Sequence, residues 1–230
     1  MTNIAENIRV IRERMARAAV QAGRDPKEIL LVGASKMNDA AACRAAVAAG
    51  IDALGENRVQ EMTAKLAEGA YDGAPLHFIG HLQRNKVRQV VGKAALIHSV
   101  GSLELLEEIR RQAEKLELTQ DVLLEVNIGG EESKSGFDPE ELFQAAEKAR
   151  TFPRVRVLGL MTIPPIQQKE HGNFSYFEKV ARLYVDISRN LYDNNFKYLS
   201  MGMSDDFEDA IAAGATMIRV GSAIFGHRQY

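Results

Sequence analysis

Short apolar runs alternate with longer amphipathic stretches along the whole chain, and this rhythm limits the possible folds more than any other feature. The apolar runs have the length of buried strands, and the stretches between them carry apolar residues at helical spacing. Such alternation is typical of βαβ units, in which helices join parallel strands. We predict strands at residues 29–35, 51–54, 76–79, 96–100, 122–127, 155–160, 198–201 and 216–220.

The intervals between these runs predict helices. Asp138 before Pro139, and Ser204 before two acids, are signals of a helix start. An amphipathic segment at 4–20 precedes the first strand and predicts one additional helix. The helices between strands are expected at 39–49, 59–67, 86–91, 103–116, 139–150, 174–190 and 205–213.

Eight strand–helix units within 230 residues favour one fold class. We expect an α/β protein with a closed (β/α)₈ TIM-type barrel, since an open doubly wound sheet usually needs only five or six strands. No low-complexity linker or shift of composition divides the chain, so residues 1–230 are expected to form one domain with an additional N-terminal helix. The longest polar interruption is 163–173.

Composition and charge exclude several classes of function. The net charge is −2, with 29 basic and 31 acidic residues interleaved, so we expect no binding to nucleic acid or an anionic membrane. The lone Cys43 excludes an internal disulfide and fits a reducing compartment. Arg and Glu run through the first 20 residues, which lack the apolar core of a signal peptide. We expect a cytoplasmic monomer.

Polar residues gather where predicted strands end. In a barrel these ends meet at one mouth, where active sites form. By the two-residue period of a strand, Lys36 shares a face with Val32 and Ala34, so its amine reaches that mouth. An apolar wall or a nearby cation would favour its neutral form, a nucleophile for a carbonyl carbon, although a solvated lysine is the commoner case. The other residues at strand ends are Glu56, Asn57, Asn127, Ser200 and Arg219.

Two glycine and serine turns follow the last two strands. Gly221 and Ser222 open a turn that could present backbone N–H groups to an anion, and barrel phosphate sites often use the loops after strands seven and eight. Gly202 permits close approach of the backbone, while Ser204 alone is better explained as a helix cap.

Arg219 lies on the inward side of the last strand with Met217 and needs an acceptor, for which Glu56 and Glu125 are candidates. An amine, an anion-holding turn and an inward arginine together fit pyridoxal 5′-phosphate. This cofactor carries an aldehyde, a phosphate and a pyridine nitrogen.

Several blocks of sequence carry a resemblance to a known family. They are "VGASK", "GENRVQE", "HFIGHLQRNK", "EVNIGGEESKSG", "LGLMTIP" and "LSMGMSDDFEDAIAAGATMIRVGSAIFG". From Val32 to Gly226 the chain resembles the pyridoxal phosphate homeostasis proteins, which are related to the N-terminal barrel of alanine racemases. The resemblance implies a (β/α)₈ barrel, a Schiff base on Lys36, and Arg219 facing the pyridine nitrogen. It also implies a phosphate held by Ser200, Gly221 and Ser222, with the cofactor lined by Asn57, Met201, Gly202 and Met203.

Three positions depart from the pattern of this family. Gly101 stands where an aspartate is common, and His81 and Arg84 stand where many relatives carry proline and serine. None of the three belongs to the implied cofactor contacts.

The resemblance implies a non-catalytic protein that buffers or delivers pyridoxal phosphate, with effects on amino and keto acid balance. A guanidinium opposite the ring nitrogen disfavours a second proton there, which weakens the ring as an electron sink. Alanine racemases add a second domain that supplies a catalytic tyrosine, and we expect none here because the chain ends four residues after Gly226. Recipients would be apoenzymes that depend on this cofactor.

Two alternatives stay open. One is a narrow-specificity racemase or lyase with Tyr198, His77 or Lys134 as acid or base. The other is a Schiff-base aldolase that acts on sugar phosphates without a cofactor. A metal site is not expected, because His77 and His81 are four apart in a segment that reads as strand and loop rather than helix.

Overall fold

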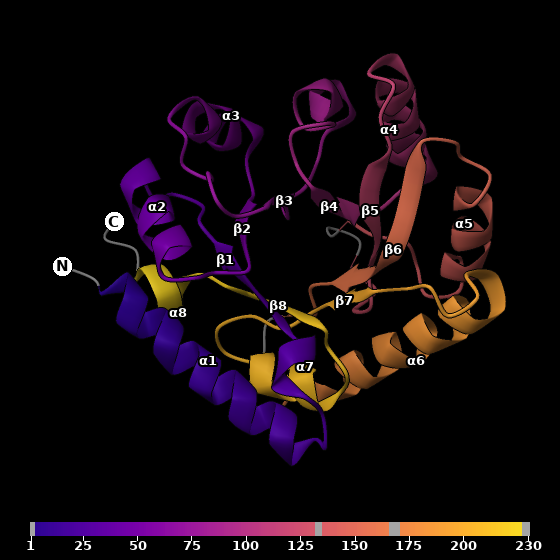
Figure 1. Ribbon diagram of the computed structural model, residues 1–230. Coiled ribbons are helices and arrows are strands. Elements are labelled where there is room, and N and C mark those ends of the chain that lie inside the picture. The colour runs from indigo at the N-terminus through magenta and orange to yellow at the C-terminus, as the bar shows by residue number, and fades with distance from the viewer. Residues whose placement is uncertain (1–2, 132–134, 166–170, 227–230) are drawn as a thin grey trace.

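The computed structural model describes residues 3–131, 135–165 and 171–226. Eight parallel strands pair in chain order, and β8 returns to β1 to close the barrel, with Val32 opposite Arg219 (Figure 1). The predicted barrel is therefore confirmed. The strands are β1 Leu30–Ala34, β2 Ala53–Glu56, β3 Leu76–Phe78, β4 Leu96–Val100, β5 Gln120–Val126, β6 Val155–Thr162, β7 Tyr198–Ser200 and β8 Met217–Val220.

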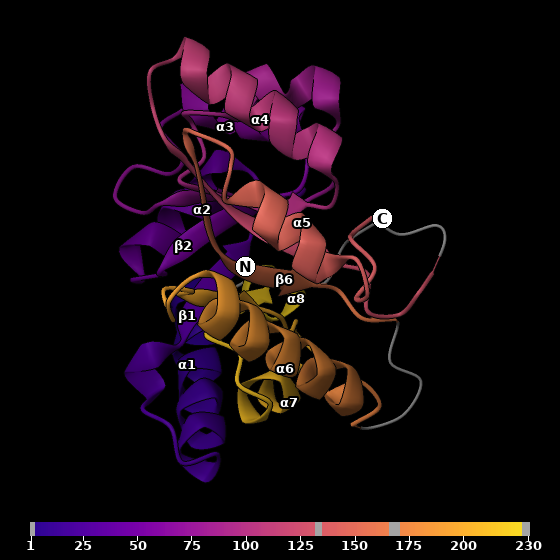
Figure 2. The same cartoon turned by 90° about the vertical axis from the view of Figure 1, so that its right-hand side faces the viewer.

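Helices surround the barrel. Contacts join α4 to α5, α5 to α6 and α6 to α7 around one side (Figure 2). The first helix, α1, contacts α7, α8 and α2, so it covers the flank where β8 meets β1. The helices are α1 Ile4–Gln21, η1 Pro26–Glu28, α2 Ala40–Ala48, α3 Val59–Ala67, η2 Arg84–Gln89, α4 Leu103–Lys115, α5 Leu142–Ala149, α6 Phe174–Leu191, α7 Phe207–Ala212 and α8 Ser222–Phe225.

Apolar side chains form two layers because successive strand residues point to opposite faces. A large cluster packs between the strands and the helices. A smaller cluster fills the barrel itself, and its buried members are Val32, Ala53, Leu96, Leu123, Leu158, Met161 and Met217. Since Val32 belongs to this inner cluster, its strand face is the one that points into the barrel, as the period of two predicts.

Several element boundaries differ from the predictions, and three of the differences bear on the argument. The second strand runs from Ala53 to Glu56, so Glu56 ends the strand instead of following it. The helix expected at 139–150 begins at Leu142, since the carbonyl of Asp138 accepts the N–H groups of Glu141 and Leu142 in a turn that comes first. The segment expected at 86–91 is a 3₁₀ helix, η2. Among the described residues, no helix combines the length and apolar character needed to cross a bilayer.

Candidate functional site

A cavity of about 360 Å³ opens at the carboxyl ends of β1, β7 and β8. It brings together five residues that were predicted as site residues, namely Lys36, Met203, Arg219, Gly221 and Ser222. The remaining lining residues are Ala34, Met37, Asn38, Ser204, Asp205, Phe225 and Gly226. An amine, a guanidinium and two hydroxyls thus share one cavity.

Lys36 stands in a tight turn directly after β1. The N–H of Asn38 donates to the carbonyl of Ser35 at 3.1 Å, which closes a four-residue turn with Lys36 and Met37 in the middle. Met37 has a φ of +63°, in the left-handed region that glycine or asparagine usually occupies. This turn directs the half-buried Lys36 toward the cavity instead of continuing the strand.

Ser204 and Ser222 place their hydroxyls side by side in the cavity wall. Their Oγ atoms lie 3.1 Å apart, although the residues come from the loops after β7 and β8. The interpretation of Ser204 as a helix cap is wrong, because α7 begins at Phe207 and Asp206 is the residue before it. The Asp206 carboxylate instead accepts the N–H of Met203 at 2.7 Å and so ties back the loop that carries Ser204.

Gly221 brings the chain close to β1. A Cβ at this position would lie 3.2 Å from the carbonyl oxygen of Ala34, so a larger residue would push the loop away. Glycine here keeps Ser222 near the turn of Lys36.

Ser200 lies beneath the cavity and does not line it. Its side chain is fully buried, and its Oγ accepts a hydrogen bond from Arg219 Nη1 at 2.6 Å. The same Oγ is 3.0 Å from His98 Nδ1. Ser200 therefore supports Arg219 from below, whereas Ser204 lines the cavity wall, and the phosphate contact that the resemblance implies for Ser200 stays a prediction.

The structure places three more predicted residues outside the cavity. Met201 is fully buried in the outer apolar cluster. Gly202 has a φ of +90°, and a Cβ there would lie 2.6 Å from the Cβ of Ala210, so this glycine permits tight packing against α7. Asn57 lines a neighbouring hollow with His81, and its buried Oδ1 has no hydrogen-bond partner among the described residues.

Arg219 is held by groups other than the two predicted acids. Its Nη2 donates to the carbonyl of Thr162 at 2.9 Å, in addition to the bond to Ser200. Glu56 is the wrong partner, because its carboxylate faces away from the barrel interior and pairs with Lys65 at 2.6 Å. Burial lowers the pKa of Arg219 to about 10, while the charges of Asp206 and Glu125 oppose this shift. The guanidinium therefore stays protonated at neutral pH.

A chain of hydrogen bonds continues from Arg219 across the barrel. His98 Nε2 is 3.1 Å from His77 Nδ1, and both imidazoles are buried. The guanidinium only donates, so the Ser200 hydroxyl is its acceptor, while a neutral His98 donates through one ring nitrogen and accepts through the other and so links Ser200 to His77. Burial lowers the pKa of His77 to about 4 and that of His98 well below its usual value, so both rings are neutral at pH 7.

The residues considered as acids or bases in an enzyme are not in this cavity. His77 is buried within the barrel, and Tyr198 packs against the inner apolar cluster. His81 is exposed, and its Nδ1 is 2.7 Å from Ser135 Oγ. Lys134 lies outside the described residues. Within the described part of the chain, no three His, Cys, Asp or Glu side chains are placed to hold a metal ion.

Glu125 gives the protein a testable pH dependence. Burial raises its pKa from 4.5 to about 7, against the opposing charge of Arg219. Between these values the native state keeps a proton that the unfolded chain has released, so Glu125 lowers the stability as pH rises. We expect Glu125→Gln to stabilise the protein by about 2 kcal/mol more at pH 8 than at pH 5.

Urea unfolding of both proteins at the two pH values measures this difference. His77 has the opposite effect, because its lowered pKa makes stability rise with pH. This effect is the same in both proteins, so it cancels in the difference between their free energies of unfolding. An equal change at pH 5 and pH 8 would show that Glu125 titrates normally.

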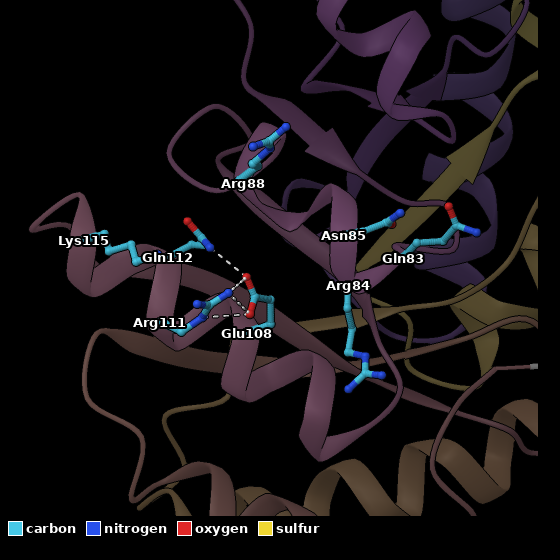
Figure 3. Close-up of a pocket in the computed structure, with 8 residues that line it drawn as sticks. All are labelled: Gln83, Arg84, Asn85, Arg88, Glu108, Arg111, Gln112 and Lys115. Carbon is cyan, nitrogen blue, oxygen red and sulfur yellow. Dashed lines mark hydrogen bonds and ion pairs between the residues drawn. The ribbon is translucent and has the colours of Figure 1, made fainter.

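The three positions that depart from the family pattern meet at a separate hollow of about 520 Å³, lined by His81, Arg84 and Gly101 among others. A Cβ at Gly101 would lie 2.7 Å from the backbone nitrogen of Gly136, so an aspartate does not fit here. A further hollow of about 760 Å³ lies between η2 and α4 (Figure 3). There Glu108 is already bonded to Arg111 and Gln112, and none of the predicted site residues lines it.

Comparisons with known proteins agree with this geometry. The family model described as "Alanine racemase, N-terminal domain" matches residues 1–229. A pyridoxal phosphate homeostasis protein of Aquifex aeolicus is 42% identical over 99% of this chain and 100% of its own length. One of Pseudomonas aeruginosa is 41% identical over 100% of this chain and 98% of its own. The chain belongs to the pyridoxal phosphate homeostasis protein family.

Solved structures extend this assignment. PipY of Synechococcus elongatus, solved with pyridoxal phosphate bound, is 33% identical with a TM-score of 0.84, over 97% of this chain and 100% of that one. A protein of Bifidobacterium adolescentis described as unknown is 38% identical with a TM-score of 0.90, over 96% and 94%. An alanine racemase of Clostridium difficile, at 18% identity and a TM-score of 0.72, shares the fold over 99% of this chain and 57% of its own. The family resemblance predicted from the sequence is confirmed.

Proposed function

We propose that this protein binds pyridoxal 5′-phosphate at Lys36 and buffers or delivers it without catalysing a reaction of its own. The observation that carries the proposal is the meeting of Lys36, Arg219 and the Ser204–Ser222 pair in one cavity. The names of its relatives and the pyridoxal phosphate bound to PipY support the same cofactor.

The residues present fit each part of this cofactor. When bound, the cofactor supplies an aldehyde and a phosphate. Lys36 offers a primary amine for covalent attachment, and the Ser204 and Ser222 hydroxyls offer donors for the phosphate oxygens. Arg219 offers a fixed positive donor for the ring nitrogen, held in place by Ser200 and Thr162.

The same surroundings argue against catalysis. A protonated Arg219 disfavours protonation of the ring nitrogen, which weakens electron withdrawal by the ring. Among its described residues the cavity wall contains no histidine or tyrosine, and its carboxylate, Asp205, is exposed. Apart from the Lys36 amine itself, proton transfer at a bound amino acid therefore lacks a second buried, positioned acid or base.

The test combines colour with turnover. With pyridoxal phosphate the protein should turn yellow, bleach with borohydride, and leave alanine and other free amino acids unchanged. Racemisation or cleavage of an amino acid at about 1 s⁻¹ or faster would make it an enzyme. A colourless protein that cleaves a sugar phosphate would support the aldolase instead.

Delivery to apoenzymes, a monomeric state and a cytoplasmic location complete the proposal. The closed barrel, in which each described strand is paired on both sides, supports the monomeric state, and the buried thiol of Cys43 supports a reducing location. Transfer is tested by mixing the loaded protein with a cofactor-free aminotransferase and following recovery of its activity.

The serine pair has a prediction of its own. Ser204→Ala combined with Ser222→Ala should weaken binding of pyridoxal phosphate by about tenfold or more, because hydrogen bonds to a charged group are lost. Binding of pyridoxal, which has no phosphate, is the matched control and should not change. Equal losses for both ligands in a titration would place the phosphate elsewhere.

A further inference from the structure

Helix α3 reaches the turn of Lys36 with two side chains. Lys65 Nζ donates to the carbonyl oxygen of Ser35 at 2.8 Å. Glu61 Oε2 accepts the N–H of Met37 at 2.7 Å. One bond holds the peptide group before Lys36 and the other holds the peptide group after it. Both peptide planes that flank the Lys36 Cα are thus fixed from α3.

The two side chains act from one face of the helix. Glu61 and Lys65 are four residues apart, which places them one above the other on α3. Lys65 is buried with the apolar face of the helix, whereas the Glu61 side chain is 23% exposed. A shift of α3 would therefore move both contacts together.

A buried network holds Lys65 in position. Glu56 Oε1 accepts from Lys65 Nζ at 2.6 Å, from Ser35 Oγ at 2.6 Å and from Tyr71 Oη at 3.0 Å. Glu56 is fully buried and Lys65 is 6% exposed. A buried ion pair stabilises a fold only weakly, because desolvation offsets the attraction, so its more effective contribution is to fix a geometry.

Glu61 supports a strained residue. Met37 keeps a φ of +63°, which costs a non-glycine residue about 1 kcal/mol or more, and the residue remains 62% exposed. Burial of this side chain therefore does not explain the conformation, which is supported by the turn that the Asn38 N–H closes and by the charge-assisted bond from the Met37 N–H to Glu61.

We infer that Glu61 and Lys65 are positioning residues for Lys36, and that α3 sets how readily this lysine takes and keeps the cofactor. The inference rests on the proposed function. It assigns to the "GENRVQE" segment and the lysine that follows it a role in lysine geometry, distinct from any contact with the cofactor itself.

Three variants test it. Glu61→Ala removes the acceptor of the Met37 N–H, Glu61→Gln keeps an amide oxygen there, and Glu68→Ala removes an exposed acid at the end of the same helix. The first readout is the rate at which pyridoxal and borohydride label Lys36 in the cofactor-free protein, located by peptide mass spectrometry. Pyridoxal has no phosphate, so this rate does not depend on the serine pair. The second is the rate of pyridoxal phosphate loss.

Glu61→Ala should slow labelling of Lys36 and speed cofactor loss, each by about tenfold, with little change in thermal midpoint. Glu61→Gln should recover most of both rates, and Glu68→Ala should match the unaltered protein. If Glu61→Ala behaves like Glu68→Ala, the inference is wrong. If the unaltered protein itself takes no label at Lys36, the proposed function fails instead.

Discussion

Lys36→Ala should abolish covalent cofactor uptake and leave the protein folded. The residue supplies the primary amine that lines the cavity and stands in a turn, half-buried, so its removal should cost about 1 kcal/mol of stability or less. The yellow band and the mass gain after borohydride should both be absent. Absorbance and intact-protein mass spectrometry measure them.

Lys93→Ala is the matched control for this experiment. Lys93 is exposed and precedes β4, so it lies at the end of the barrel opposite the cavity. It should keep the full yellow band. A Lys36→Ala protein that remains yellow and is still modified would move the attachment to another lysine.

Lys65→Met should be the most destabilising of the substitutions considered, at about 3–5 kcal/mol. It leaves the Glu56 carboxylate fully buried without its cation. It also removes the donor to the Ser35 carbonyl. Urea unfolding followed by circular dichroism gives the free energy of unfolding.

A double variant separates the buried charge from lost packing. Glu56→Gln together with Lys65→Met removes the unpaired charge while the amide can still accept from Ser35 and Tyr71. It should recover at least half of the lost stability. If Lys65→Met alone costs under about 1 kcal/mol, water must reach the Glu56 carboxylate, and the network is then not shielded from solvent.

The fold was predictable because its signals are local. Apolar runs of strand length and helical spacing between them recur along the chain, and the closed barrel follows from their number. Boundaries were less predictable, since Asp138 and Ser204 carry capping signals but turns intervene before α5 and α7. Because the start of α7 was predicted a few residues too early, Ser204 was interpreted as a helix cap and left out of the predicted site.

The site residues were predictable where two features determine them, namely the alternation of side chains along a strand and the position at which a strand ends. Lys36, Arg219, Gly221 and Ser222 follow from those two features, and the structure places all four at the cavity. The partners of Arg219 did not follow, because Ser200 and Thr162 reach it through pairing across strands far apart in sequence.

The contacts by which α3 supports the turn of Lys36 could not be predicted from the sequence either. Glu61 and Lys65 look like solvated charges on an amphipathic helix, and nothing in their spacing reveals that one is buried against Glu56. Only the packing of α3 on the barrel brings them to the turn after β1.

The most direct test of the central claim is to load the protein with pyridoxal phosphate, reduce it with borohydride, digest it and map the modified residue by mass spectrometry. The account predicts one modified lysine per chain, and that lysine is Lys36. Modification spread over exposed lysines, or centred on any residue outside the cavity, would contradict it.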